Sequence, residues 1–331
     1  MPVHNCGAYL RTAVDSMLQQ QDVLLELIII DDHSTDQAIQ NLPQDPRIRI
    51  IKSPQAGIVS ALNTGLEHAN YPFIARMDGD DIALPGRLYA QLKYLLDNSD
   101  IDICGTQVEI FKDHGKIDDG YGHYQKWINQ LNTHQEIVAN FFVESPIPHP
   151  TAMLRTALLI ELGAYQDTSW AEDYDLWCRA FTQNKRFGKP KVGPLLRWRD
   201  HSERSSRVHT RYSKNEFLKC KAKYLALHLG QRAINSCEIW GTGPTGLKLH
   251  DYLQKRGIQT NRFVDANPKL QGGLKRDKPV FVISETITQQ QVDDIGDLII
   301  VAVSTRGARD LIRNSLQSIQ LLEMRDFILA A

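Results

Sequence analysis

Residues Tyr71–Met77 (YPFIARM) run directly into Asp78–Asp81 (DGDD), and this junction decides the expected fold. The first segment has the apolar and aromatic content of a strand. The acidic run that follows marks the point where the strand ends. In open α/β sheets, ligands bind beyond the carboxyl ends of the strands. We therefore expect Asp78–Asp81 to lie at the ligand-binding edge of a sheet.

Strand and helix signals alternate on both sides of this junction, which favours a mostly parallel sheet with flanking helices. Residues 25–30 predict a buried strand that ends in Asp31 and Asp32, so a second acid pair also follows a strand. The expected fold class is α/β. Further strands are predicted at 47–51 and 101–109, and helices at 9–20, 58–69 and 85–96.

Residues Met1–Asn5 (MPVHN) look like the last part of a first strand. An α/β domain needs an innermost strand before the helix predicted at 9–20. Either the true start lies upstream of Met1 or this strand is very short, and the sequence leaves both alternatives open.

The composition excludes several classes of protein. The 331 residues are 42% hydrophobic and 23% charged, which excludes wholesale disorder and fits two domains. A net charge of −1 excludes a globally basic nucleic-acid binder, and no nucleic-acid partner is expected. The apolar run at 23–30 is far shorter than the ~20 residues of a membrane span. Five scattered cysteines suggest neither a disulfide framework nor a zinc site, so we expect a cytoplasmic protein.

Positive charge is concentrated between Lys185 and Lys223, where 13 Lys and Arg residues face three Asp and Glu residues. Such a block attracts a phosphorylated substrate or an anionic membrane, which predicts peripheral contact with the inner face of the cell membrane. The alternative is a solvated helical face.

The Asp78–Asp81 run predicts a divalent metal site. Three carboxylates within four residues repel one another unless a cation lies among them. Mg²⁺ typically uses one or two carboxylates together with substrate phosphates, and a metal there would neutralise a departing diphosphate. The alternative is a turn that caps the helix predicted from Pro85 onward.

Two further acidic segments are candidates for binding and proton transfer. A carboxylate in the run 31–36 could accept a hydrogen bond from a nucleobase or hold a ribose hydroxyl. The alternative interpretation of this run is that Ser34 or Thr35 caps a helix. Glu172 and Asp173 open a predicted helix, where acids complement the helix dipole or serve as a general base for a sugar hydroxyl.

Two histidines are weaker candidates. His149 lies in a proline-rich loop that would hold it rigidly, although a lone histidine is more often structural. His201 lies in the basic block and could supply a metal ligand or a phosphate contact.

Taken in order, these motifs resemble the family 2 glycosyltransferases of the GT-A fold over about residues 1–205. The resemblance rests on the segments 2–5, 31–36, 78–81, 85–91 and 172–177, together with Gly57, Asn63 and Gly65. It implies an inverting, metal-dependent transfer of a sugar from a nucleotide-diphosphate sugar. The implied acceptor is a glycan or a lipid-linked hydroxyl, and the implied process is the assembly of cell-surface polysaccharide.

The resemblance also implies roles for individual residues. Asp173 would be the catalytic base, with His149 and Glu172 on the acceptor side. Asp80, with Asp78 and His201, would hold Mg²⁺ or Mn²⁺. The donor-binding residues would be Pro2, His4, Asn5, Asp32, Gly57, Asn63, Asp78 and Gly79.

A second unit is predicted at 233–331, after a glycosyltransferase domain at 1–232 whose basic helical segment covers about 185–232. Gly241, Gly243 and Gly246 form a GxGxxG run that follows a strand and opens a helix, and Asp265 ends the next strand. This context fits a dinucleotide-binding fingerprint in a Rossmann-like domain and makes these four residues a candidate second nucleotide site. No substrate-oxidising group accompanies them, so we do not expect NAD to bind.

Two rival functions remain at this point. The first is an NAD-dependent or nucleotide-sensing protein that acts through the C-terminal domain. The second is a nucleotidyltransferase, which also uses paired aspartates and a metal, but the glycine-rich basic loop expected near the N-terminus is absent from the sequence.

Overall fold

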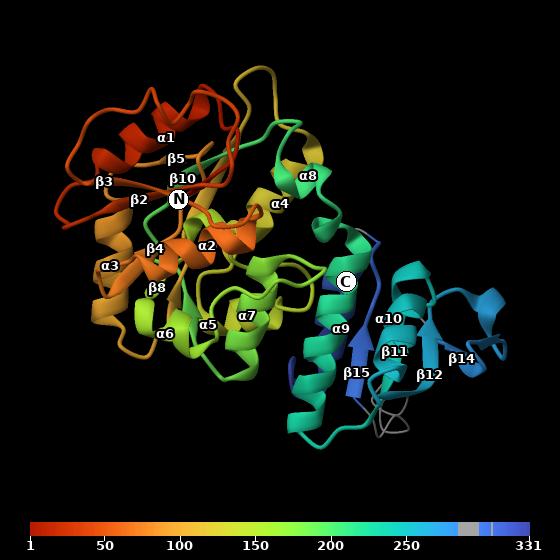
Figure 1. Ribbon diagram of the computed structural model, residues 1–331. Coiled ribbons are helices and arrows are strands. Elements are labelled where there is room, and N and C mark those ends of the chain that lie inside the picture. Colours follow the sequence, from red (N-terminus) through yellow and green to blue (C-terminus); the bar gives the residue numbers. More distant parts are fainter. Residues whose placement is uncertain (284–297, 306) are drawn as a thin grey trace. The chain divides into compact units, whose positions relative to one another are not determined.

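The computed structural model describes residues 1–283, 298–305 and 307–331 (Figure 1). The chain divides into two compact units, the first formed by 1–137 and 146–209, the second by 138–145 and 210–331. This division differs from the sequence-based boundary at 232/233, because helix α9 (Lys214–Gln231) packs on helix α10 (Pro244–Gln254). Buried Lys221 of α9 also donates to the carbonyl oxygen of Ala330 over 2.7 Å.

The first unit begins with a parallel three-stranded sheet of order β1-β2-β3 (Pro2–Val3, Leu27–Asp31 and Ile48–Lys52). Strand β1 has only two residues, which pair with Ile30 and Asp31 of β2. Helix α1 (Tyr9–Leu18) buries Leu10, Val14 and Met17 at the spacing of one helical face. Helix α2 (Ile58–Glu67) follows β3 and packs on β2.

Two mixed sheets complete this unit. One has the order β4-β8-β6-β9 (Phe73–Ala75, Met153–Arg155, Ile103–Cys104 and Phe187–Gly188), and the other has the order β5-β10-β7 (Ile82–Ala83, Pro194–Arg199 and Gln107–Phe111). The prediction of a single strand at 101–109 is wrong, because β6 and β7 belong to different sheets. The break contains Gly105, where a Cβ atom would lie only 3.0 Å from the Ile147 side chain.

The first unit also contains several helices outside its sheets. Helix α3 (Arg87–Asp97) begins after Gly86 without a side-chain cap, so the alternative that Asp78–Asp81 caps this helix is wrong. Residues 33–46 form bends and turns, so Ser34 and Thr35 cap no helix either. The other helices are α4 (Asp119–Gln130), α6 (Thr156–Glu161), α7 (Glu172–Thr182) and α8 (Ser205–Val208), with a 3₁₀ turn at His149–Thr151. Helix α5 (His134–Ala139) begins in the first unit and ends in the second, which also contains the 3₁₀ turn at Thr210–Tyr212.

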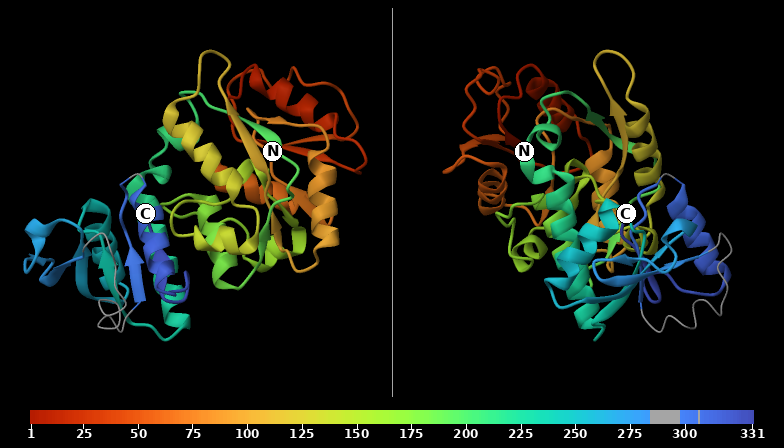
Figure 2. Two further views of the ribbon diagram at one scale, coloured as in Figure 1. Left: turned by 180° about the vertical axis from the view of Figure 1, so that it is seen from behind. Right: turned by 90° about the vertical axis from the view of Figure 1, so that its right-hand side faces the viewer.

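The second unit contains a six-stranded sheet of order β13-β14-β12-β11-β15-β16, in which β13 pairs with β14 antiparallel and the other described pairs are parallel. Figure 2 shows the blue strands of this unit from two further sides. Its strands are Leu274–Lys275, Lys278–Val282, Gln259–Asp265, Ser236–Trp240, Leu298–Val301 and Phe327–Leu329. Among the described residues, this unit also contains helix α12 (Ala308–Ser318) and a short 3₁₀ turn at Pro268–Leu270. The expected C-terminal α/β unit is therefore present.

No helix within the described ranges combines the length and apolar character needed to cross a bilayer.

Two glycines give opposite predictions for stability. Gly65 lies inside α2, where an added Cβ would meet Ile30 at an ordinary 3.5 Å, beside an apolar cavity of about 530 Å³. Alanine is favoured over glycine in a helix by about 1 kcal/mol, so Gly65→Ala should raise the Tm of the first unit by roughly 2–4 °C. At Gly246, a Cβ would lie 2.0 Å from the carbonyl oxygen of Gly241, so Gly246→Ala should lower the stability of the second unit. Calorimetry of both variants checks the pair, and a lower Tm for Gly65→Ala would contradict the packing described for α2.

Candidate active site

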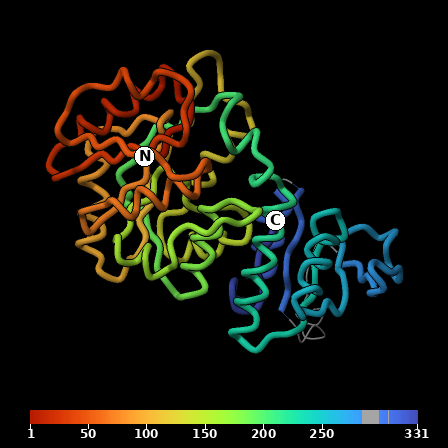
Figure 3. Tube along the Cα trace, viewed as in Figure 1, coloured from red at the N-terminus to blue at the C-terminus, as the bar shows by residue number. Residues whose placement is uncertain are grey.

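The acid cluster forms directly after strand β4, as the sequence predicts. Met77 is buried, and the chain then turns so that one ligand oxygen from each of Asp78, Asp80 and Asp81 lies within 4.8 Å of the others. Gly79 permits this turn, since a Cβ there would lie 2.8 Å from Cys6 Sγ and 3.3 Å from the Val3 side chain. Figure 3 shows the red N-terminal segment beside the orange chain that follows β4.

Basic residues from two directions hold the cluster together. Arg76, which precedes it in sequence, forms an ion pair with Asp78. The C-terminal end of β10 supplies Arg199, whose backbone N–H donates to Asp81 Oδ1 over 2.8 Å and whose Nε donates to the Asp80 carbonyl oxygen over 2.7 Å. His201 Nε2 lies 2.9 Å from Asp80 Oδ2. The structure thus brings His201 beside Asp80, where the resemblance places it.

The pKa values of Asp80 and Asp81 are shifted in opposite directions. Burial alone would raise the pKa of Asp80, but the hydrogen bond from His201 and the charge of Arg204 lower it below the ordinary value. Burial and the charges of Asp78 and Asp80 raise the pKa of Asp81 well above the ordinary value. Asp80 is thus an ionised ligand candidate, whereas Asp81 is buried and held by the backbone. The carboxylates of this cluster fit the preference of Mg²⁺ and Mn²⁺ for oxygen ligands.

A cavity of about 570 Å³ lies beside the Asp80–His201 pair. His201 stacks at a tilt on Tyr9, with their ring centroids 5.4 Å apart, and the Arg199 guanidinium lies over the same Tyr9 ring. The cavity is lined by Tyr9, Lys112, Asp113, His114, Asp200, His201, Ser202 and Arg207. Its cations are paired within the protein, Arg207 with both carboxylate oxygens of Asp200 and Lys112 with Asp118 and Asp200.

The predicted donor-binding residues at the N-terminus form one network with the loop that follows β2. His4 Nδ1 lies 2.6 Å from the Asp32 carbonyl oxygen. Asn5 Oδ1 accepts from the Thr35 backbone N–H over 2.7 Å, and Asp32 Oδ1 accepts from the Gly57 N–H over 2.7 Å. Pro2 lies in β1 directly before this network.

Asn63 lies apart from this network. Its Nδ2 donates to the Tyr165 carbonyl oxygen over 2.9 Å, and its Oδ1 accepts from the Tyr165 N–H over 3.0 Å. Asn63 therefore ties helix α2 to the loop that precedes helix α7.

Glu172 and Asp173 form the first turn of α7, as predicted. Burial and the neighbouring charge of Glu172 raise the pKa of Asp173 to about 7, although Arg76 and the Tyr174 N–H act in the opposite direction. The Tyr174 N–H donates to Asp173 Oδ1 over 2.7 Å. A carboxyl group with a pKa near 7 is suited to general-base catalysis at neutral pH.

His149 is buried next to this turn. Its Nε2 lies 2.8 Å from the Tyr165 hydroxyl, and its Nδ1 lies 4.0 Å from Glu172 Oε1. Burial and the charge of Arg76 lower the pKa of His149 well below its ordinary value, so the ring is neutral and does not form an ion pair with Glu172.

Sequence reasoning missed the roles of Arg76 and Arg199. Arg76 is 7% exposed and interacts electrostatically with Asp78, Glu172 and Asp173. The available signal was a cation inside an apolar strand segment, because charged residues are rarely buried without a partner. Arg199 was counted only as a member of the basic block. That block is no single surface, since Lys189 and Lys221 are buried.

The glycine run of the second unit lies between β11 and α10, as expected. Gly241 has a φ of 112°, and Gly243 precedes the helix. Asp265 Oδ2 accepts from both the N–H (2.9 Å) and the hydroxyl (2.5 Å) of Thr242, while its Oδ1 accepts from the Asn267 N–H. Ribose hydroxyls would have to compete with these bonds.

Several proteins with similar sequences are named as glycosyltransferases. The O-antigen biosynthesis glycosyltransferase WbnJ of Escherichia coli is 28% identical over 248 residues, which cover 71% of this chain and 90% of that protein. EpsE of Bacillus subtilis is 30% identical over 222 residues, which cover 64% of this chain and 76% of that protein.

A solved protein structure shares the fold of this chain. The structure of S. aureus TarS 1–349 in complex with UDP-GlcNAc is similar, with a TM-score of 0.53 and 16% identity, over 76% of this chain and 70% of that one. Residues 1–163 match the family model "Glycosyl transferase family 2". The family match and these relatives show that the chain belongs to glycosyl transferase family 2.

Proposed function

We propose that this glycosyltransferase transfers a sugar with inversion from a nucleotide-diphosphate sugar to a hydroxyl group of a glycan or lipid-linked acceptor. The observation that carries the proposal is the placement of Arg76. Its charge acts on Asp78 of the acid cluster and on Glu172 and Asp173 of the α7 turn. One buried arginine thus pairs with the candidate metal site and influences the candidate base, which supports the action of both on one substrate.

In the proposed reaction, Asp173 accepts the proton of the acceptor hydroxyl. The oxygen attacks the anomeric carbon from the side opposite the leaving group, and the bond between that carbon and the diphosphate oxygen breaks. A single displacement of this kind inverts the configuration at carbon, and positioning of the two reactants supplies much of the rate enhancement. The hydroxyl proton ends on Asp173, and the nucleoside diphosphate leaves.

The residues around Asp80 support the leaving-group side. Asp78, Asp80 and His201 would hold Mg²⁺ or Mn²⁺, which when bound stabilises the negative charge of the departing diphosphate. Asp32 and the loop containing His4 and Asn5 would hold the nucleoside.

Relatives support a role in cell-surface polysaccharide biosynthesis. WbnJ is named for O-antigen biosynthesis, and AmsE of Erwinia amylovora, 27% identical over 176 residues, for amylovoran biosynthesis. We extend this process to the present chain. A cytoplasmic location, with basic residues touching the inner membrane face near a lipid-linked acceptor, belongs to the same proposal.

The pKa of Asp173 predicts the pH dependence of transfer. A base must be unprotonated, so kcat/KM should fall about tenfold per pH unit below a pKa near 7 and level off above it. Asp173→Asn keeps the shape of the side chain and should lower kcat by about 100- to 10,000-fold at every pH. Release of nucleoside diphosphate from a panel of UDP- and GDP-sugars, measured with acceptor between pH 5 and pH 9, checks both effects.

Retention of full activity by Asp173→Asn would remove Asp173 as the base. Release of pyrophosphate in place of nucleoside diphosphate would instead favour a nucleotidyltransferase.

The acid cluster predicts dependence on a divalent cation. A chelator should abolish transfer, and Mn²⁺ or Mg²⁺ should restore it. Asp80→Asn should lower kcat/KM by at least about 100-fold, which corresponds to the several kcal/mol that a metal supplies to a developing charge. Asp97→Asn is the matched control, because Asp97 is a 55% exposed carboxylate on α3. Equal activity of the two variants, or full turnover in chelator, contradicts the metal site.

A further inference from the structure

Helix α3 places two polar side chains, Arg87 and Gln91, in the core of the first unit. Both residues are fully buried, and they lie one helical turn apart, so that Arg87 Nε donates to Gln91 Oε1 over 3.1 Å. The acceptors described for the Arg87 guanidinium are two carbonyl oxygens, an amide oxygen and a thioether, all of them neutral. A buried charge among neutral acceptors is costly, and an apolar side chain would often cost less. The position of Arg87 is therefore better explained by the segments that it joins.

The Arg87–Gln91 pair joins two segments that are far apart in sequence. Arg87 Nη2 donates to the carbonyl oxygens of Arg76 and of Pro150, each over 2.6 Å. Gln91 Nε2 donates to the Thr151 carbonyl oxygen over 2.7 Å. One pair of side chains thus fixes the chain before the acid cluster and the turn at 149–151 to the same helix.

The first of these segments leads into the candidate metal site. Arg76 forms an ion pair with Asp78, and its backbone N–H donates to the Ala152 carbonyl oxygen over 2.8 Å. Met77 lies between them in sequence, and its Sδ is 3.1 Å from Arg87 Nη1. The position of the acid cluster therefore depends on where Arg87 holds residues 76 and 77.

The second segment is attached to helix α7, which carries Asp173. The indole N–H of Trp177 in α7 donates to the Ile147 carbonyl oxygen over 3.2 Å. The Trp177 ring also packs edge-on against His149, with the ring centroids 6.0 Å apart. His149 Nε2 lies 2.8 Å from the hydroxyl of Tyr165, in the chain that leads to α7.

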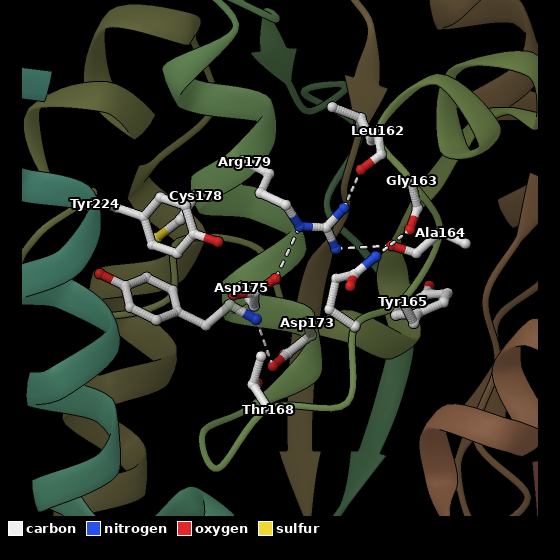
Figure 4. A network of polar contacts seen from close by, with 12 residues as sticks. Leu162, Gly163, Ala164, Tyr165, Thr168, Asp173, Asp175, Cys178, Arg179 and Tyr224 are labelled. Atoms are coloured by element: carbon white, nitrogen blue, oxygen red, sulfur yellow. Dashed lines mark hydrogen bonds and ion pairs between the residues drawn. The ribbon is translucent and has the colours of Figure 1, made fainter. Parts of the chain in front are cut away.

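Helix α7 fixes that chain as well. Arg179 donates to the Ala164 carbonyl oxygen over 2.7 Å, directly before Tyr165, and its Nε donates to Asp175 over 2.8 Å (Figure 4). The turn at 149–151 therefore has a fixed position relative to the helix turn that contains Asp173.

We propose that Arg87 and Gln91 are positioning residues that align the acid cluster with Asp173 for the transfer reaction. They act through the backbone carbonyl groups of residues 76, 150 and 151 and contact neither substrate. In a single displacement, the attacking hydroxyl and the leaving diphosphate must lie on opposite sides of the anomeric carbon, and the rate is sensitive to their placement. The proposal rests on the proposed function and adds the residues that align its two halves.

Arg87→Met tests this role, because it removes both bonds to the carbonyl oxygens and leaves an apolar side chain in the core. The rate measured is nucleoside diphosphate release from UDP- and GDP-sugars, with water or methyl glycosides as the acceptor. We expect kcat to fall on the order of 100-fold, the effect of a misplacement of roughly 1 Å. The donor KM, and the binding of Mn²⁺ with UDP or GDP followed by electron paramagnetic resonance, should change by less than about twofold, since each half of the site stays formed.

Two milder variants keep the test decisive if Arg87→Met does not fold. Arg87→Lys retains the charge and one donor, so it should recover part of kcat. Gln91→Leu removes the bond to Thr151 but leaves Arg87 in place, so it should lower kcat by a smaller factor than Arg87→Met.

Arg155→Met is the matched control. Arg155 of β8 also donates to two backbone carbonyl groups, those of Ile101 and Leu95, but neither belongs to the site. This variant should lower the Tm, measured by calorimetry, and leave kcat unchanged.

Three results would overturn the proposal. The first is an unchanged kcat in Gln91→Leu and in whichever Arg87 variant folds. The second is an equal loss of kcat in Arg155→Met, which would reduce the effect to general stability. The third is loss of Mn²⁺ and nucleotide binding in parallel with kcat, since the pair would then build the metal site and not align it. In all three cases metal-dependent turnover by the unmodified enzyme leaves the proposed function standing, whereas absence of that turnover would remove the proposed function and this proposal with it.

Discussion

Repulsion among Asp78, Asp80 and Asp81 is the constraint on which the first unit depends. Three carboxylates with ligand atoms within 4.8 Å are unfavourable unless cations offset them. The protein supplies part of that charge itself, through Arg76 at one side and the Arg199–His201 segment at the other. Strand β10, which carries Arg199, pairs with β5, and β5 directly follows the cluster in sequence. The pairing of these strands therefore places Arg199 beside the cluster. Asp80, whose pKa is lowered, is left beside His201, which lines the adjacent cavity.

Arg76 interacts with both the candidate metal site and the candidate base. Arg76 interacts with Asp78 and also with the Glu172–Asp173 turn. Burial drives the pKa of Asp173 up, and Arg76 limits the rise, so the group titrates near neutrality. A more isolated carboxyl would stay protonated, and a fully exposed one would be a weaker base. The buried arginine thus helps to set the basicity of Asp173 while pairing with the acid cluster.

Local sequence patterns predicted much of this architecture. The strand before Asp78, the start of α7 at Glu172 and the glycine run before α10 all follow from apolar periodicity and helix-start signals. The proximity of His201 to Asp80 came from family resemblance, since nothing local joins residues that are 121 positions apart.

Long-range packing explains what the sequence did not predict. The split of 101–109 into β6 and β7 reflects their different partners, since β6 pairs with β8 and β9 and β7 pairs with β10. The pairing of Asn63 with the Tyr165 backbone joins residues 102 positions apart, and polar pattern alone could not distinguish it from a donor contact. The grouping of α9 with the second unit likewise depends on packing against α10 and on the contact of Lys221 with Ala330.

The central claim is that the acid cluster binds a divalent cation together with a nucleoside diphosphate. Electron paramagnetic resonance of Mn²⁺ tests it most directly, because the signal of free Mn²⁺ is lost on binding. The account predicts that UDP or GDP strengthens Mn²⁺ binding to the protein, and that this coupling disappears when Asp80 is replaced by Asn. Identical Mn²⁺ binding by the two proteins in the presence of nucleotide would contradict it.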